Sequence, residues 1–162
     1  LFALLVSLAL QSYEQVGKVQ SGIVYYFASY IEWPAAKQTG DFEISVLGAT
    51  DLTDYLQTLA KVKTVGSRKI TVKSVSSISE AKGSHILFLA ENKLDQFESA
   101  AQIAKSNSIL LVTDKNGYGK KGAGINFITK DGKPSYEINQ SMVNACELKV
   151  SSKLTDLGSV IN

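Results

Sequence analysis

Residues that bind metals or form crosslinks are scarce in this sequence. Its 162 residues include one cysteine, Cys146, and one histidine, His85. One cysteine cannot form an internal disulfide, and zinc needs three or four convergent Cys, His or carboxylate ligands. We therefore expect no disulfide, no metal and no cofactor. Cys146 is expected to be a small buried hydrophobic residue, with a reactive thiol as the alternative. His85 begins an apolar run and is expected to be structural.

An excess of charge of one sign is also lacking. Lys and Arg number 17 and Asp and Glu number 15, which gives a formal net charge of +2. The nearest approach to a basic cluster is the pair Lys120–Lys121, in a glycine-rich loop. Proteins that bind nucleic acid carry basic patches or stripes, so we do not expect a nucleic-acid partner.

The patterns that usually accompany catalysis are missing or incomplete. The chain has no G-x-S-x-G motif, and its carboxylates are scattered singly. Gly117, Gly119 and Gly122 fit G-x-G-x-x-G, but a strand-like segment follows them, whereas dinucleotide sites need a helix there. His85 and Cys146 are the only Cys–His pair, and neither has flanks that indicate an activated nucleophile. We predict no catalytic residues; the alternative is an acid–base pair that only folding brings together.

The longest uncharged apolar run lies at the start of the chain, "LFALLVSLAL". It is too short to span a bilayer, which needs about 20 residues. It fits the apolar core of a secretory signal, with small residues at Ser7 and Ala9 at the spacing of a cleavage site. The alternative is a first helix packed in the core. We expect residues 1–9 to be a signal-peptide remnant and residues 10–162 to form one domain outside the cytoplasm.

The segment 17–32 has the apolar spacing of a helix, which Pro34 should end. The pattern predicts that Val19, Ile23, Tyr26 and Tyr30 pack inward, and that the opposite face, with Tyr25, is available to a partner.

Strand-like and helix-like segments alternate along the rest of the chain. Strands are expected at 42–48, 68–75, 85–90, 108–114, 123–129 and 133–139, and helices at 51–62, 94–105 and 141–146, with a last helical turn near the end. Asp131-Gly132 between two alternating runs predicts a hairpin. Alternation of this kind predicts an α/β fold: a three-layer sandwich with a mixed, mostly parallel sheet, a C-terminal antiparallel hairpin, and helices on both faces.

Ordered blocks of the sequence resemble the YfiR family of periplasmic regulators. The first is "VGKVQSGIVYYFASYIEWP", which matches the family's aromatic helix ending in F-x-x-Y-x-E-W-P. The others follow in order: "FEISVLG", "SHILFLA", "ILLVTD", "GAGINFI", "YEIN" and "ELKVSSKL".

The resemblance implies a non-catalytic periplasmic repressor that binds an inner-membrane diguanylate cyclase. In such systems an outer-membrane lipoprotein can sequester the repressor, so that cyclic-di-GMP and biofilm formation rise. Family members tend to form homodimers. The founding members also carry disulfides, but this chain has Ser84 where one of their cysteines lies, and no cysteine in 115–122. Redox control through an internal disulfide is therefore excluded.

Seven residues are candidates for partner contacts: Tyr25, Trp33, Asn126, Asn139, Ser151, Lys153 and Leu154. The alternative for Tyr25 and Trp33 is a role in the core, where Trp33 would close the sheet edge. The alternative for the two asparagines is that they bond to backbone groups at strand ends; otherwise they would line a groove between the hairpin and the last helix, together with 151–153.

Three function classes remain open from the residues. A regulator that binds another protein predicts an exposed apolar patch. A small-ligand sensor predicts a concave pocket with a few convergent polar groups. An enzyme requires a cleft with paired titratable side chains.

Overall fold

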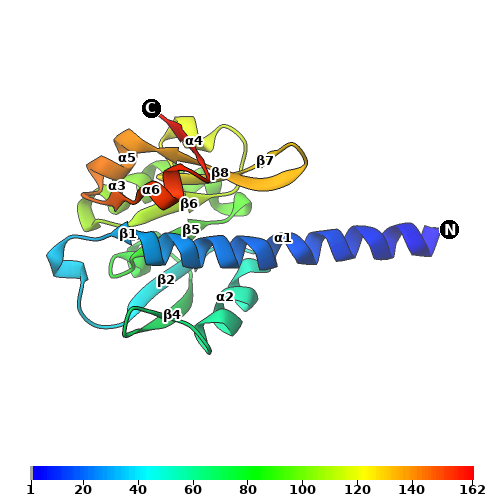
Figure 1. Cartoon of the computed structure of the whole chain (residues 1–162), viewed down its shortest axis with the longest axis horizontal. Helices are drawn as coiled ribbons and strands as arrows, with labels where there is room; N and C mark the ends of the chain where they lie inside the picture. The colour runs from blue at the N-terminus through cyan, green and yellow to red at the C-terminus, as the bar shows by residue number, and fades with distance from the viewer. Residues whose placement is uncertain (1) are drawn as a thin grey trace.

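A mixed sheet of eight strands forms the centre of the protein (Figure 1). The computed structural model describes residues 2–162, with side chains from Val16 onward. The strand order is β10-β8-β7-β6-β5-β2-β4-β3. The strands are β2 Phe42–Leu47, β3 Thr64–Val65, β4 Arg68–Val75, β5 Ile86–Leu89, β6 Leu110–Thr113, β7 Ile125–Lys130, β8 Lys133–Asn139 and β10 Ser159–Ile161.

Most neighbouring strands run parallel, as predicted. Strands β4, β2, β5, β6 and β7 form a continuous parallel block, and β10 pairs parallel with β8. The β7–β8 hairpin is antiparallel, and so is the short β3–β4 pair at the opposite edge. Every residue of β5 and β6 is buried, because helices cover a parallel sheet on both faces.

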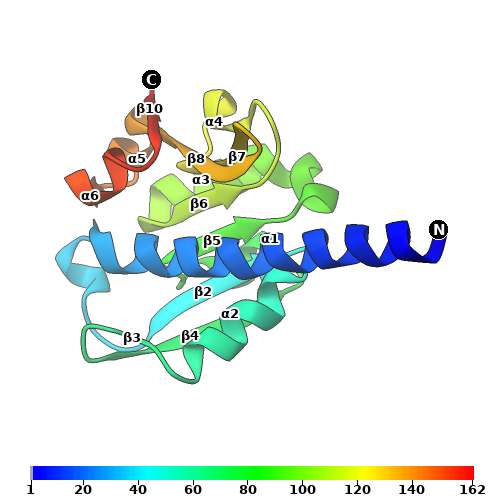
Figure 2. The ribbon, with the colours of Figure 1, turned by 45° about the vertical axis from the view of Figure 1, so that its right-hand side comes forward.

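Three longer helices cover the two faces of the sheet (Figure 2). Helix α1, Phe2–Tyr30, packs beside α2, Leu52–Ala60, and α3, Phe97–Asn107, contacts β5 and β6. The connections β2-α2-β4 and β5-α3-β6 run in opposite directions along the sheet. Since such crossovers are right-handed, α2 and α3 lie on opposite faces, which confirms the predicted sandwich.

Several short elements complete the chain. They are the helices α4 Tyr118–Lys121, α5 Gln140–Ala145 and α6 Ser152–Thr155, and the 3₁₀ turns Ala35–Lys37, Ile78–Ala81 and Glu91–Gln96. A separate two-stranded ribbon pairs β1, Ile31–Glu32, with β9, Lys149–Val150. The sequence patterns did not predict this ribbon, β3, β10 or α4, because segments of two to four residues carry no periodicity.

The predicted hairpin turn is confirmed. Lys130 pairs with Lys133, which leaves Asp131 and Gly132 as the two loop residues. Their φ angles are +52° and +73°, the positive values that a type I′ turn requires and that Asp-Gly supplies at low cost.

The N-terminal predictions have mixed outcomes. The predicted helix end at residue 32 is wrong by two residues, because Ile31 and Glu32 leave the helix to pair with β9. The side chains of the proposed signal remnant, residues 1–9, lie outside the described ones. Among the described residues, no helix is both long and apolar enough to cross a bilayer.

Candidate partner-binding surface

Helix α1 presents an apolar stripe to solvent. Val16, Val19 and Tyr26 are 41%, 44% and 48% exposed. Two further residues of the same side, Ile23 and Tyr30, are half-buried. These five residues, the α1 stripe, follow one another at spacings of three and four, so they lie on one side of the helix.

The sheet-facing side of α1 is a different set of residues. Val24, Phe27 and Ala28 are buried. The Phe27 ring meets the Tyr136 ring edge-on, with 5.0 Å between centroids, and lies 5.9 Å from the Phe127 ring. This aromatic cluster fixes the helix on β7 and β8.

The prediction that Val19 and Tyr26 pack on the sheet is therefore wrong. Both sides of the helix are apolar, so periodicity alone could not choose between them. Small residues decide the orientation: a Cβ at Gly17 would lie 2.8 Å from the Asp51 carboxylate, so the helix approaches the start of α2 through its glycine side. The run of small residues Gly17 and Ser21 could have identified this side in the sequence.

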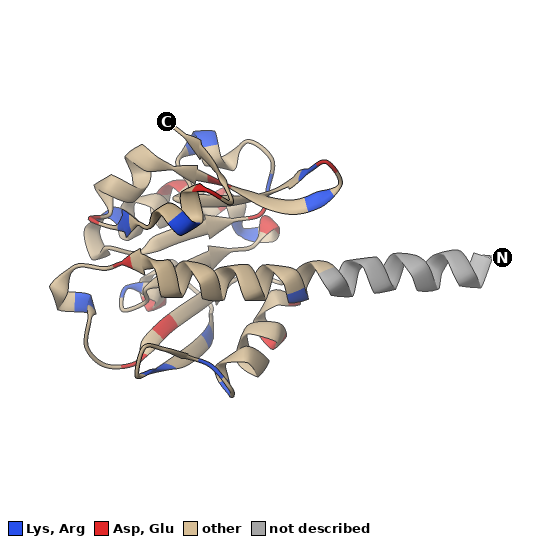
Figure 3. Cartoon of the chain, viewed as in Figure 1, with Lys and Arg blue, Asp and Glu red and all other residues tan. Residues whose placement is uncertain are grey.

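The α1 stripe is nearly free of charge along its length (Figure 3). From Val16 to Tyr30 the only charged residue is Lys18. At the C-terminal end, the Tyr26 and Tyr30 ring centroids lie 5.4 Å apart, and the Lys153 ammonium lies 4.7 Å from the Tyr30 centroid. The stripe thus ends in two tyrosines beside a cation from α6.

Tyr25 and Trp33 make contacts within the chain. The half-buried Tyr25 hydroxyl donates a hydrogen bond to the Thr64 carbonyl (3.0 Å). Trp33 is buried; its indole N–H donates to the His85 carbonyl (3.3 Å), and its ring packs edge-on against Phe42 at 5.1 Å. The alternative interpretation of Trp33, a core residue that closes the sheet edge, is the one that the structure matches.

The two asparagines are also buried. Asn126 accepts from the Thr113 hydroxyl (2.7 Å) and donates to the Glu137 carboxylate (3.3 Å). Asn139 accepts from the backbone N–H of Met142 at the start of α5 (2.8 Å). Asn126 also accepts from the Lys115 backbone N–H (3.3 Å), so both asparagines bond to backbone groups inside the fold, as the alternative interpretation proposed.

Residues 151–154 lie near the C-terminal end of the α1 stripe. The Ser151 N–H donates to the Tyr30 carbonyl (3.0 Å), and the Ser151 hydroxyl accepts from the Lys153 N–H (3.2 Å). Leu154 is fully buried. Of the seven candidates, Ser151 and Lys153 therefore lie beside the stripe, whereas the asparagines lie elsewhere.

Two further titratable groups are held by local contacts. Burial lowers the pKa of Lys37 to about 8, against the opposing effect of Glu43, and its ammonium donates to the Ser84 carbonyl. Burial raises the pKa of the Cys146 thiol to about 11. A neutral, buried thiol is a poor nucleophile, which matches the expectation of a small hydrophobic residue.

Comparisons with known proteins show which fold and which family this chain resembles. No curated protein matches the chain. A solved structure described as the ABC domain in complex with L-Trp from Streptococcus pneumoniae is 9% identical, with a TM-score of 0.51 over 74% of this chain and 55% of that one. The chain thus spans about half the length of that protein, and the likeness is one of fold alone.

The family match covers nearly the whole chain. The model of the YfiR/HmsC-like family matches residues 17–159, which include the α1 stripe except Val16 and the sheet except the last two residues of β10. The chain therefore belongs to the YfiR/HmsC-like family, as the ordered sequence blocks predicted.

Proposed function

We propose that this protein is a periplasmic regulator that binds a membrane-anchored signalling protein, a diguanylate cyclase or a similar enzyme, and holds it inactive. Membership of the YfiR/HmsC-like family supports a non-catalytic role in cyclic-di-GMP signalling. The α1 stripe is the observation that carries the proposal, because exposed apolar surface rich in aromatic side chains is typical of protein–protein interfaces.

The stripe fits one kind of occupant best. From Val16 to Tyr30 it runs along about 21 Å of helix, at 1.5 Å per residue. Tyrosine is among the residues enriched at binding hot spots, and two tyrosines end the stripe. We place there an apolar helix of the enzyme's periplasmic part, with an acidic group positioned to meet Lys153.

Release follows from competition for the same protein. An outer-membrane lipoprotein that sequesters the regulator would free the enzyme, and cyclic-di-GMP and biofilm formation would rise. No internal disulfide takes part in this scheme, because Cys146 is the only cysteine in the chain.

The α1 stripe is tested by single acidic substitutions. Val19→Asp and Tyr26→Asp alter exposed side chains, so we expect both variants to fold. Val62→Asp is the matched control, since Val62 is a 79% exposed residue away from the stripe. Tagged proteins are used to capture partners from solubilised envelope, followed by mass spectrometry, and cellular cyclic-di-GMP is measured in parallel.

We expect the unaltered protein and Val62→Asp to recover a membrane protein with a cytoplasmic cyclase domain. With the two stripe variants, recovery of that membrane protein should fall at least about tenfold, which corresponds to a loss of about 1.4 kcal/mol of binding free energy. Cells that carry these variants should contain more cyclic-di-GMP. Light scattering after gel filtration separates self-association from partner binding. If the stripe variants only convert a dimer to a monomer, and enzyme recovery is unchanged, the proposed function of the stripe is wrong.

A further inference from the structure

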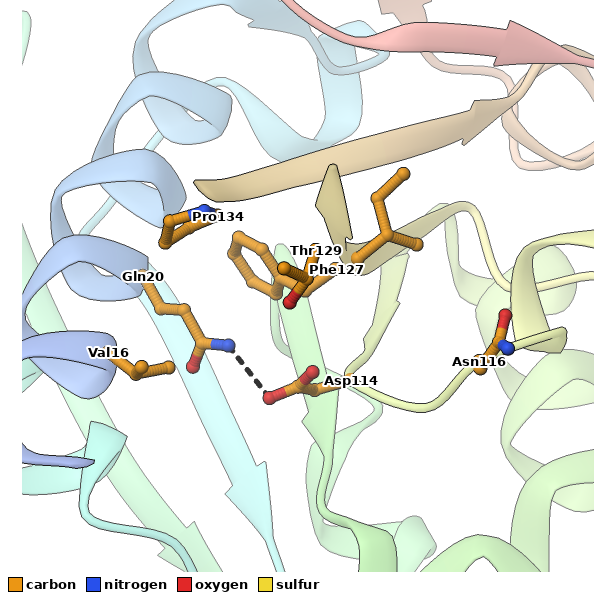
Figure 4. A pocket seen from close by; sticks show the side chains of 8 residues that line it. Val16, Gln20, Asp114, Asn116, Phe127, Thr129 and Pro134 are labelled. Carbon is orange, nitrogen blue, oxygen red and sulfur yellow. Dashed lines mark hydrogen bonds between the residues drawn. The ribbon is translucent and has the colours of Figure 1, made fainter. Parts of the chain in front are cut away.

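A hollow borders helix α1 next to the N-terminal end of the α1 stripe, at the C-terminal end of β6. It measures about 350 Å³ and opens between α1 and the β7–β8 hairpin (Figure 4). Its volume falls in the range of about 300–1,000 Å³ that small-molecule sites occupy. Four chain segments meet at it, so it is formed by the folded domain and not by one loop.

The polar end of the hollow presents hydrogen-bond acceptors. Gln20 is only 5% exposed, and its side-chain NH₂ group donates to the Asp114 carboxylate (2.7 Å). That bond uses one of the two N–H donors of the amide, and the carbonyl oxygen of Gln20 is left to accept. The Thr129 side chain also lines the hollow and lies above Asp114, next to Phe127 (Figure 4).

No cation among the described side chains balances this end. None of the residues that line the hollow is Lys or Arg. Lys115, which follows Asp114 in the chain, bonds to the Glu91 carboxylate instead. The Asp114 carboxylate therefore has Gln20 as its neighbour and keeps capacity for a charged donor.

Apart from Asn116, the remaining wall of the hollow is apolar. Val16 lines it from α1, and Phe127 and Pro134 line it from the hairpin. The labelled rings of Phe127 and Pro134 lie above the Gln20–Asp114 pair in Figure 4. An occupant that meets both parts must combine a hydrogen-bonding cation with an apolar body.

We propose that this hollow binds a small protonated amine with an apolar body. The ammonium donates to the Asp114 carboxylate and the Gln20 carbonyl, which are charge-assisted bonds and stronger than neutral ones. The apolar body packs on Phe127 and Pro134. A ligand that carries its own carboxylate, such as an α-amino acid, is disfavoured because its negative charge would lie near Asp114 with no described cation on the lining.

The position of the hollow connects it to the α1 stripe. Val16 belongs to both, and Gln20 lies on the same helix one turn further. A bound amine therefore contacts the N-terminal end of the stripe. The binding proposal itself does not depend on the proposed regulatory function and is tested separately.

The test is a titration of the folded protein with 2-phenylethylamine, followed by amide NMR. Three close analogues serve as ligand controls: 2-phenylethanol, which lacks the charge, 3-phenylpropionate, which inverts it, and L-phenylalanine, which adds a carboxylate. Asp114→Asn removes the charge of the site. Asp156→Asn removes another exposed carboxylate, at the end of α6.

We expect 2-phenylethylamine to bind with a Kd of about 1 mM or tighter, with shifts at Gln20 and Phe127. Asp114→Asn should weaken binding at least about tenfold, and Asp156→Asn should leave it unchanged. Equal binding of 2-phenylethanol or L-phenylalanine, or the absence of shifts near the hollow, would overturn the proposal. The ligand series on the unaltered protein decides this even if Asp114→Asn does not fold.

Discussion

At the scale of single residues, His85 shows how a buried titratable side chain is held in one protonation state. The Glu43 N–H donates to Nδ1 (3.1 Å), so Nδ1 must be unprotonated. Nε2 then carries the proton and donates to the Lys37 carbonyl (2.8 Å). An Arg68 guanidinium nitrogen lies 2.9 Å from Nε2, next to any charge that the ring would gain. Protonation would thus break one hydrogen bond and place two cations together.

The His85 environment predicts loss of stability in mild acid. Burial lowers the pKa of His85 below its usual value of 6.5, and the nearby Arg68 and Lys37 charges act in the same direction. The unfolded chain then binds more protons than the folded one below pH 6.5. The contribution is complete above that pH and declines as pH falls through the folded-state pKa. The slope for one proton is at most about 1.4 kcal/mol per pH unit.

Urea unfolding between pH 7.5 and pH 5 measures this effect. We expect the free energy of unfolding to fall as the pH is lowered from 7.5 to 5. Carboxyl groups usually have a pKa of about 4, so this pH range lies above their usual titration. His85→Gln should be less stable at pH 7.5, because the acceptor for Glu43 is displaced, but should show a flatter profile. Parallel profiles for the two proteins would assign the pH dependence to another group.

For single residues, the sequence predicted the general role of a side chain but not its bonding partners. The lone histidine before an apolar run is expected to be structural, and the lone cysteine in an alternating segment is expected to be buried; the structure buries both. The partners of His85 come from residues 37, 43 and 68, which are distant in the chain. Contacts of that kind depend on strand order, which local patterns do not encode.

At the scale of elements, Asn139 joins three segments. It ends β8, and its Oδ1 caps α5 by accepting from the Met142 N–H (2.8 Å). Its Nδ2 donates to the Gly119 carbonyl inside α4, also at 2.8 Å. One side chain therefore fixes the start of α5 against α4, which explains the burial of a polar residue at this position.

Asn139→Ala should be strongly destabilising. Loss of an N-cap costs about 1 kcal/mol. The Gly119 carbonyl keeps a second donor, the Gly122 N–H (3.2 Å), so loss of its bond to Asn139 costs about 0.5–1.5 kcal/mol. We therefore expect the free energy of unfolding to fall by about 1.5–2.5 kcal/mol, measured by urea titration. Asn139→Asp is the informative comparison, because it keeps the cap acceptor and loses the donor to Gly119. A near-neutral Asn139→Ala would show that neither bond contributes in solution.

Helix α1 shows what element-level patterns can and cannot predict. The helical spacing and the break before Pro34 were readable, since both are local. The apolar spacing alone did not show which side faces the sheet, because apolar residues occur on both sides. The side that α1 buries is decided by the approach of Gly17 to Asp51 and by the cluster of Phe27 with Tyr136 and Phe127. The α1 stripe, the main candidate site, was missed for that reason.

At the scale of the whole molecule, continuous apolar runs predicted the centre of the sheet and not its edges. Alternating strands and helices with right-handed crossovers leave few arrangements, and the mostly parallel sheet follows from them. The pairing of β10 with β8 and of β1 with β9 joins segments of two or three residues. Ile31 pairs with Val150 although most of the chain separates them, and no local pattern in either segment predicts that pairing.

The stability of the whole molecule rests on this core without any covalent crosslink, which leads to a last prediction. Cys146 is buried beside Val143 and Leu148, which are buried too, and its pKa is raised to about 11, so the reactive thiolate is rare at neutral pH. We expect a thiol reagent to modify the native protein at least about 100-fold more slowly than the urea-unfolded chain. The free energy of unfolding should be the same with and without a reductant. If the native thiol reacts as fast as the thiol of the unfolded chain, the segment around Cys146 must become exposed readily in the folded protein. Redox control through an intermolecular disulfide would then be the better explanation of regulation.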